Sequence, residues 1–319
     1  MNDIAEDMLA AISDFRTRSN TIIDALVTEI EKYEPPNLIY HYTNDVGLRG
    51  IIESGKIWIA NAFKLNDPTE VIHGFSCLMA ALKLRRDSDK PEIAAFVEGF
   101  EAFVREGGIQ EAAHIYVCSF SESNDDLGQW RAYGDNGCGF ALAFDSKEIE
   151  TAFVVNAKAR KLAASTFPVN YDHGAIERIQ NTLVELILPL LSLPRGKQIS
   201  GEAISSYFKN LSVLLSSSGM LSSLFFKHEA YANEKEYRLQ LIHQGGSHPP
   251  SVKFRTRPHG LIDYLEFDWR SVAPGALKKI VVGPAGDRDR ANQFARDCLQ
   301  AFGGIGVEIV PSTIPYRVA

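Results

Sequence analysis

The chain has 319 residues, and 45% of them are hydrophobic, so one large domain or two modest ones can form a core without disulfides or metals. Its net charge of -7 argues against a protein that coats nucleic acid. No apolar run approaches the roughly 20 residues that span a bilayer, and acidic residues stand where a signal peptide would be basic. We therefore expect no membrane association, and nucleic-acid binding is not supported.

The four cysteines (Cys77, Cys118, Cys138 and Cys298) show no paired spacing and no CxxC motif. This pattern is typical of free thiols in a reducing compartment and predicts a cytoplasmic protein. None of the eight histidines forms an HxH or HExxH pattern, so no metal site is predicted. A GxSxG nucleophile motif is also absent.

In chain order, residues 1–34 predict one amphipathic helix that ends at Pro35-Pro36. Residues 35–319 predict a single α+β domain. Its expected strands are 38–43, 57–59, 114–120, 138–144, 234–242, 261–267, 279–282 and 307–311, and its expected helices are 45–54, 69–84, 91–105 and 287–301. Residues 173–230 are rich in Leu and Ser and predict a helical insertion. The expected fold is a central, mostly antiparallel sheet with flanking helices and a helical lobe.

The strand at 38–43 carries the motif Tyr40-His41-Tyr42-Thr43. A period of two puts His41 and Thr43 on one face of the strand and both tyrosines on the other. His41 either donates a hydrogen bond to a ribose or phosphate, or is a core histidine satisfied by a backbone carbonyl. Thr43 is also a good cap for the helix that follows.

Asn66-Asp67-Pro68 with Glu70 indicates a turn and a helix start, and Asn66 or Asp67 as the cap explains the pattern. Alternatively, Asp67 and Glu70 lie at the rim of a binding cleft. Trp130 and Tyr133 are three residues apart on a short predicted helix, so they share one surface. This surface either packs in the core or stacks on a base or nicotinamide, with Arg131 available for phosphate.

Glu234, Glu236 and Arg238 share one face of the strand predicted at 234–242. Two carboxylates beside a guanidinium can hold a ribose hydroxyl and stabilise an oxocarbenium-like centre. The alternative is a solvent-facing strand with a local ion pair.

Together these segments resemble one family. They are Tyr40-His41-Tyr42-Thr43, Leu65-Asn66-Asp67-Pro68-x-Glu70, Cys118-Ser119-Phe120-Ser121, Gln129-Trp130-Arg131-x-Tyr133, Gly137-x-Gly139-Phe140 and Glu234-x-Glu236-Tyr237-Arg238. In this order, from about residue 37 to residue 317, they resemble the bacterial family called domain of unknown function 2971. That family name implies no activity.

A more distant similarity links the chain to ADP-ribosyltransferases of the His-Tyr-Glu type. These enzymes place a histidine on an early strand and a catalytic glutamate on a late one, with tyrosines or serines between them at the nicotinamide ribose. By this resemblance, the catalytic residues are Glu236, Glu234 and His41. The implied binding residues are Tyr42, Thr43, Asn66, Asp67, Glu70, Ser119, Ser121, Trp130, Arg131, Tyr133 and Arg238.

The resulting hypothesis is an NAD-using ADP-ribosyltransferase-like or NAD-glycohydrolase-like enzyme, acting as a toxin or phage-defence effector on a nucleotide or protein acceptor. The alternatives are a non-enzymatic module that senses a nucleotide or a partner protein, and a metal-dependent nuclease that uses Asp67, Glu70, Glu234 and Glu236. If one site exists, His41, Ser119, Trp130, Tyr133 and Glu236 should line one concave pocket.

Overall fold

A computed structural model gives the structure of the protein. It describes residues 6–64, 69–86, 90–107, 113–192, 200–244, 248–257, 260–304 and 306–316. The strands are β1 (Leu38–Thr43), β2 (Lys56–Asn61), β3 (Ala113–Ser121), β4 (Phe140–Asp145), β5 (Ala163–Pro168), β6 (Glu236–Gln244), β7 (Lys253–Arg257), β8 (Gly260–Asp268), β9 (Leu277–Val282) and β10 (Glu308–Pro311).

The α-helices are α1 (Glu6–Glu31), α2 (Asp45–Ser54), α3 (Thr69–Lys83), α4 (Pro91–Arg105), α5 (Leu127–Ala132), α6 (Ser146–Ala159), α7 (His173–Leu191), α8 (Gly201–Ser223) and α9 (Arg288–Phe302). Short 3-10 turns are η1 (Ala62–Lys64), η2 (Asp135–Gly137) and η3 (Glu229–Glu234). No helix within the described ranges is long and apolar enough to cross a lipid bilayer.

The strands form one branched sheet in the order β10-β9-β4-β1-β3-β2-β8-β7. Strand β6 pairs with β3 over its length, and β5 pairs with the other edge of β6. The pairing is antiparallel except between β9 and β10, so the fold is α+β with a mostly antiparallel sheet, as predicted. Strand β3 is central, because β1 and β2 meet different parts of its second edge.

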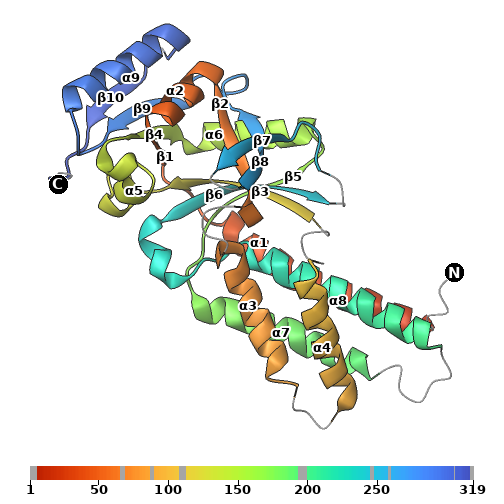
Figure 1. Cartoon of the computed structure of the whole chain (residues 1–319). Coiled ribbons are helices and arrows are strands. Elements are labelled where there is room, and N and C mark those ends of the chain that lie inside the picture. The colour runs from red at the N-terminus through yellow and green to blue at the C-terminus, as the bar shows by residue number, and fades with distance from the viewer. Residues whose placement is uncertain are drawn as a thin grey trace.

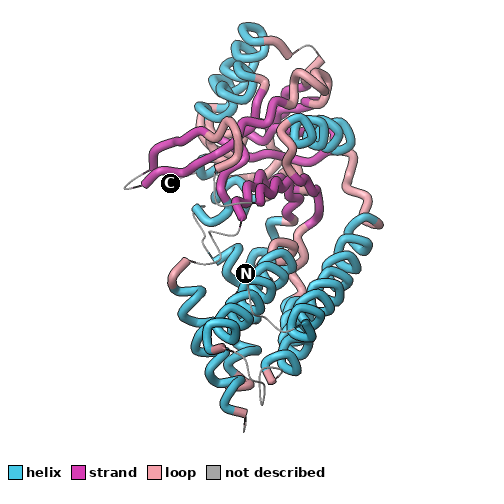
Figure 2. Tube along the Cα trace, turned by 90° about the vertical axis from the view of Figure 1, so that its right-hand side faces the viewer, coloured by secondary structure: helices cyan, strands magenta, loops and turns pink. Residues whose placement is uncertain are grey.

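Helices cover both faces of the sheet (Figure 1). On one face, which we call the α6 face, helices α2, α6 and α9 pack on a core that includes Ile39, Tyr116 and Leu239. On the other, which we call the lobe face, Ile115 and Val117 of β3 pack against a helical lobe made of α1, α3, α4, α7 and α8. Figure 2 shows this lobe as a bundle below the strands.

The helical lobe is larger than the segment 173–230 that predicts it. That segment forms α7 and α8, but α3 and α4 pack against them from an earlier part of the chain. Helix α1 also packs on α7 and α8, burying Met8, Phe15 and Ser19. Ser19 interrupts the apolar repeat of the first helix in the sequence, yet its side chain is buried, because a small residue fits where helices approach closely.

Helix α6 and strand β5 are not among the predicted elements. Ile149 and Phe153 lie four residues apart on α6 and pack on the sheet, so the helical repeat is present in the sequence. Strand β5 begins after the turn at Lys161, whose φ of 57° is in the left-handed region. It then extends the sheet beyond β6, opposite Arg238 and Gln240.

Candidate functional site

The candidate site is built around Glu236, the first residue of β6. Register pairs Ser121 with Glu236 and Ser119 with Arg238, so these four side chains lie together on the lobe face. Lys227 approaches from the segment between α8 and η3. We call the group of Ser119, Lys227, Glu234, Glu236 and Arg238 the Glu236 site.

Both carboxylate oxygens of Glu236 are engaged. Oε1 accepts hydrogen bonds from Ser119 Oγ at 2.7 Å and from Arg238 Nε at 2.7 Å, while Oε2 lies 3.2 Å from Lys227 Nζ. The residue is 4% exposed. Burial by itself would raise the pKa of Glu236, but the charges of Arg238 and Lys227, with the hydrogen bonds, lower that pKa to about 2. The carboxylate is therefore ionised at neutral pH.

Glu234 also belongs to the Glu236 site, but it does not lie in the predicted strand. It ends η3, and Lys235 has φ 45° and ψ 53°, which turns the chain before β6 begins. Glu234 Oε2 lies 2.6 Å from Lys227 Nζ, and Oε1 accepts a hydrogen bond from Tyr133 OH at 3.0 Å. The expectation that Glu234 lies in the strand is wrong, yet the two carboxylates still converge, on the ammonium of Lys227.

Hydrogen bonds to the backbone fix the turn between η3 and β6. Ser121 Oγ donates to the Glu234 carbonyl at 2.7 Å, and the Glu236 amide donates to Tyr171 OH at 2.9 Å. Arg238 Nη1 donates to the Leu224 carbonyl at 3.2 Å, at the end of α8. Ser121 therefore positions the turn through the backbone, and Arg238 links the sheet to the helical lobe.

His41 does not face the Glu236 site. Tyr40 pairs with Ser121, which pairs with Glu236, so these three side chains share the lobe face. His41 is one residue further along β1 and points to the α6 face, where its ring lies 5.5 Å from that of Phe120. Its Nδ1 donates to the Ser119 carbonyl at 3.1 Å, and burial lowers the pKa of His41. His41 is half-buried, and of its two interpretations this geometry is that of the histidine satisfied by a backbone carbonyl.

Thr43 shares the face of His41 and pairs with Phe140. It is not the cap of α2, because Asn44 Oδ1 accepts the Gly47 amide at 2.9 Å and Asn44 is the N-cap residue. Neither His41 nor Thr43 therefore contributes a side chain to the Glu236 site.

Trp130 and Tyr42 pack against each other in the core. Their rings are 4.8 Å apart in an edge-on arrangement, and Trp130 is fully buried. Trp130 Nε1 donates to Asp125 Oδ1 at 2.7 Å, and Tyr42 OH donates to the Ser123 carbonyl at 2.9 Å. A buried indole has no free face for a base, so of the two interpretations of Trp130 the structure has core packing, and its assignment as a binding residue is wrong.

The predicted pocket therefore divides into two groups. Ser119, Tyr133 and Glu236 are joined by hydrogen bonds through Lys227 and Glu234, whereas His41 and Trp130 lie elsewhere. Tyr133 is 47% exposed and Arg131 is exposed, so the site meets solvent on the side of α5. Asn66 and Asp67 lie outside the described residues, and Glu70 lies in α3 with a side chain outside them too.

Lys227 and Tyr171 are site residues that the sequence did not indicate. Both lie in segments without a recognisable motif, close to the helical lobe. Lys227 follows the apolar run Leu224-Phe225-Phe226, and this is a usable signal, since a lysine there is buried only when it is paired.

A match to one family model covers much of this site. Residues 129–239 match the model described as Protein of unknown function (DUF2971). No curated protein and no solved structure matches the chain.

The DUF2971 match runs from Gln129 to Leu239 and so contains Tyr133, Lys227, Glu234, Glu236 and Arg238. It is shorter than the range from 37 to 317 over which the motifs resemble the family, and Ser119 lies before it. Of the three side chains that contact the Glu236 carboxylate, Lys227 and Arg238 thus come from the matched segment and Ser119 does not.

A second buried polar cluster lies outside the DUF2971 match, on the α6 face. Asp263 of β8 is fully buried and accepts hydrogen bonds from Asn61 Nδ2 at 2.9 Å and Tyr116 OH at 2.8 Å. Lys64 Nζ lies 2.7 Å from the same carboxylate, and hydrogen bonds from these groups outweigh burial and lower the pKa of Asp263. With its charge paired, Asp263 ties β8 to β2 and β3.

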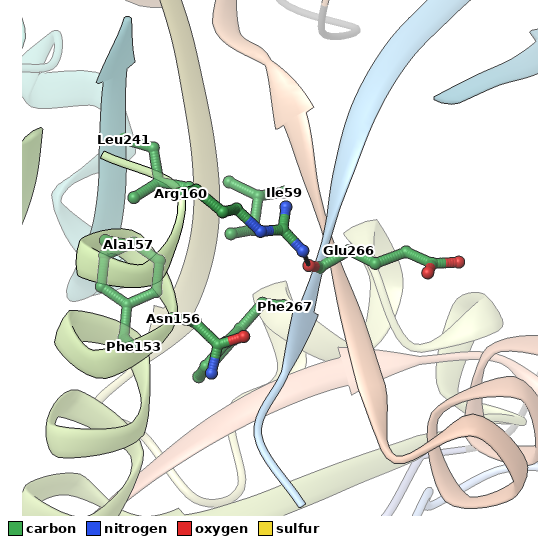
Figure 3. A pocket seen from close by; sticks show the side chains of 8 residues that line it. All are labelled: Ile59, Phe153, Asn156, Ala157, Arg160, Leu241, Glu266 and Phe267. Atoms are coloured by element: carbon green, nitrogen blue, oxygen red, sulfur yellow. Dashed lines mark hydrogen bonds between the residues drawn. The ribbon is translucent and has the colours of Figure 1, made fainter. Parts of the chain in front are cut away.

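One small cavity lies between α6 and the sheet, also on the α6 face (Figure 3). Phe153, Asn156 and Arg160 line it from the helix side, and Arg160 Nη2 donates to the Glu266 carbonyl. Its volume of about 10 Å³ is that of roughly one water molecule, so it cannot hold a nucleotide.

Proposed function

We propose that the protein is an NAD-using enzyme that transfers ADP-ribose to an acceptor or hydrolyses NAD, with Glu236 as the central carboxylate. The observation that carries this proposal is the ionised, 4% exposed Glu236 carboxylate at the start of β6. Transfer of ADP-ribose passes through a positively charged ribose, and a fixed anion in a water-poor site stabilises that charge strongly. A carboxylate with a low pKa keeps this charge at neutral pH.

The arrangement of strands supports the resemblance to ADP-ribosyltransferases. Strand β1, which carries the early histidine, pairs with β3, which carries Ser119 and Ser121, and β3 pairs with β6, which carries Glu236. The three segments that the resemblance relates are therefore neighbours in one sheet. His41 faces away from Glu236, so in this proposal it holds the Ser119 backbone and does not touch NAD.

Glu234 is the residue suited to activate the acceptor. Its side chain is more exposed than that of Glu236, and the half-exposed Tyr133 donates to it from α5. In the proposed reaction the bond between ribose C1 and the nicotinamide nitrogen breaks, and nicotinamide leaves with the electron pair. An acceptor nucleophile or water then bonds to C1 while Glu234 takes its proton.

Lys227 has a specific part in this proposal. In the structure its ammonium bridges Glu234 and Glu236, so a cation already occupies the position that the charged ribose requires. Substrate binding would exchange one cation for another, with Lys227 moving away from Glu236 as the nicotinamide ribose enters. Arg238 stays bonded to Oε1 and keeps the carboxylate in place.

The experiment measures nicotinamide release from NAD by the purified protein, with and without candidate protein and nucleotide acceptors. Replacing Glu236 by Gln should lower turnover by about 100-fold or more and change NAD binding little. Glu266→Gln is the matched control, because Glu266 is also ion-paired, with Lys56 and Lys253, on β8 outside the site. Wild-type protein that binds NAD without releasing nicotinamide would refute the enzyme and leave the second candidate.

That second candidate is a non-enzymatic module that senses a nucleotide or a partner protein. The observation in its favour is that Ser119, Arg238 and Lys227 already occupy both oxygens of Glu236. A purely structural ion cluster has this arrangement, and a ligand would then bind over Tyr133 and Arg131. Calorimetric binding of NAD that is unchanged in Glu236→Gln, with no turnover in wild type, would support it.

We do not propose the metal-dependent nuclease, because no lysine-bearing nuclease motif accompanies these carboxylates in the sequence. For the cell compartment, we propose the cytoplasm, since all four cysteines are free thiols. A role as a toxin or phage-defence effector would follow from depletion of NAD or modification of a host protein.

A further inference from the structure

Two histidines and a cysteine from distant parts of the chain meet within the helical lobe. His73 and Cys77 lie four residues apart on α3, so they share one face of that helix. His173 is the first residue of α7, which packs along α3. One nitrogen from each histidine and the Cys77 sulfur all lie within 4.8 Å of one another.

His73 has a buried ring nitrogen that needs a partner. Its Nε2 is shielded from solvent and makes no hydrogen bond within the described structure. A buried polar atom without a partner is costly and is rare in native proteins. Two more imidazoles surround it, since the His173 and His228 rings lie 5.3 Å and 5.0 Å from the His73 ring.

We propose that His73, Cys77 and His173 bind a divalent transition metal ion of the zinc class. Imidazole nitrogens and a thiolate sulfur are ligand types that Zn²⁺ prefers, and the metal would satisfy the buried His73 Nε2. In a tetrahedral zinc site such ligand atoms lie about 3.3–3.7 Å apart. The three side chains therefore need to close by about 1 Å, which rotation of the side chains on two packed helices provides.

Glu177 has the position of a supporting residue. His173 Nε2 lies 3.3 Å from Glu177 Oε1, one turn further along α7, which would leave His173 Nδ1 to bind the metal. A carboxylate that accepts the second ring N–H is the usual companion of a metal-bound histidine. The Cys77 thiol would lose its proton as the sulfur bonds to the ion, so metal binding would release one proton.

His228 is close to the cluster but is engaged elsewhere. Its Nδ1 accepts the Ala230 amide at 3.1 Å as the cap of η3. We assign three protein ligands, because the group of ligand atoms within 4.8 Å of one another contains His73, Cys77 and His173 but not His228, and the fourth position is taken by water. The metal would link α3 to α7 beside η3, whose last residue is Glu234. This proposal does not depend on any reaction at the Glu236 site.

The test is metal binding by the full-length protein. After dialysis against Zn²⁺ or Co²⁺ and removal of free ion, elemental analysis should find one metal per chain. The Co²⁺ form should show tetrahedral d–d absorption in the visible and a thiolate charge-transfer band. Cys77→Ser should abolish the charge-transfer band, and Glu177→Gln, a partly exposed substitution, should weaken metal affinity by about 10- to 100-fold.

Two controls separate this site from other thiols and imidazoles. Cys138→Ser replaces a half-buried cysteine outside the cluster and should change neither stoichiometry nor spectrum. His243→Gln alters the group of rings formed by His114, His243 and His248, and should also leave the metal in place. Wild type without stoichiometric metal, a charge-transfer band that survives in Cys77→Ser, or an affinity unchanged in Glu177→Gln would overturn the proposal. Loss of the metal in His243→Gln would show that the metal binds at the group of His114, His243 and His248, and would also overturn the proposal.

Discussion

Arg238 Nε lies 2.7 Å from Glu236 Oε1, and the two side chains are 2% and 3% exposed on the same face of β6. A pair buried this deeply differs from a surface ion pair, because removing one partner leaves the other charge in a poorly solvated place. The stability of the sheet and the chemistry of the Glu236 site therefore depend on the same contact.

Arg238→Met should lower the free energy of unfolding by about 3–5 kcal/mol, because Glu236 loses its closest cation and the link to the Leu224 carbonyl is lost. Urea denaturation followed by circular dichroism measures this. Arg290→Met is the control, since its ion pair with Asp287 is exposed and its loss should change stability little. Equal losses of unfolding free energy in the two variants would show that the buried pair stabilises the fold no more than an exposed pair does.

Acid should weaken the fold through Glu236. Its pKa is lowered from 4.5 to about 2 on folding, so its contribution is complete above pH 4.5 and is lost as the pH falls toward 2. The difference in unfolding free energy between wild type and Glu236→Gln should therefore shrink across this window. Denaturation of both proteins at several pH values measures this difference in unfolding free energy. A difference that stays constant from about pH 6 to about pH 3 would contradict the lowered pKa of Glu236.

Trp130 and Tyr133 should respond differently to replacement by Ala, although they are three residues apart. Trp130 is fully buried, so Trp130→Ala should cost about 3–5 kcal/mol of stability. Tyr133 is 47% exposed, so Tyr133→Ala should leave stability within about 1 kcal/mol but lower any NAD turnover through Glu234. Thermal unfolding and nicotinamide release distinguish them, and a strongly destabilised Tyr133→Ala would refute its position at the edge of the site.

Gly74 of α3 lies where α3 and α8 approach closely. A Cβ at this position would lie 2.7 Å from Ser223 Cβ and 2.9 Å from Ser223 Cα, so Gly74→Ala should destabilise the lobe by about 1–3 kcal/mol. Gly99 of α4 is the matched control, because no atom lies within 4 Å of its added Cβ. Gly99→Ala should stabilise by about 0.5–1 kcal/mol through helix propensity. Melting temperatures that move in the same direction would contradict this packing.

Much of the fold was predictable because the signals are local. The apolar repeats of α3, α4 and α9 and the β-branched and aromatic content of β1, β3 and β8 depend on residues a few positions apart. The predicted bounds differ from those observed by one or two residues at most of these elements. Glu234 is an exception, since Lys235 adopts a left-handed conformation that neither periodicity nor composition indicates.

The candidate site depends on contacts that periodicity does not determine. Within one strand, the sequence correctly predicts that His41 and Ile39 share a face of β1, and that Glu236 and Arg238 share a face of β6. Whether His41 and Glu236 share a face depends on the registers Tyr40 to Ser121 and Ser121 to Glu236, which link three strands from distant parts of the chain. A shift of one residue would reverse the answer, because side chains alternate faces along a strand.

The residues that complete the two proposed sites also could not be predicted from local sequence patterns. The sequence by itself determined that Glu234 and Glu236 are close and that residues 173–230 are helical, and it placed His73 and Cys77 in the helix expected at 69–84 without indicating a shared site. Only the tertiary structure brought Lys227 between the two carboxylates and His173 beside Cys77. The physical reason is that Lys227 meets Glu236 where the segment after α8 packs on β6, and His173 meets Cys77 where α7 packs on α3. Both arrangements are set by the packing of the whole apolar core, which a local pattern does not encode.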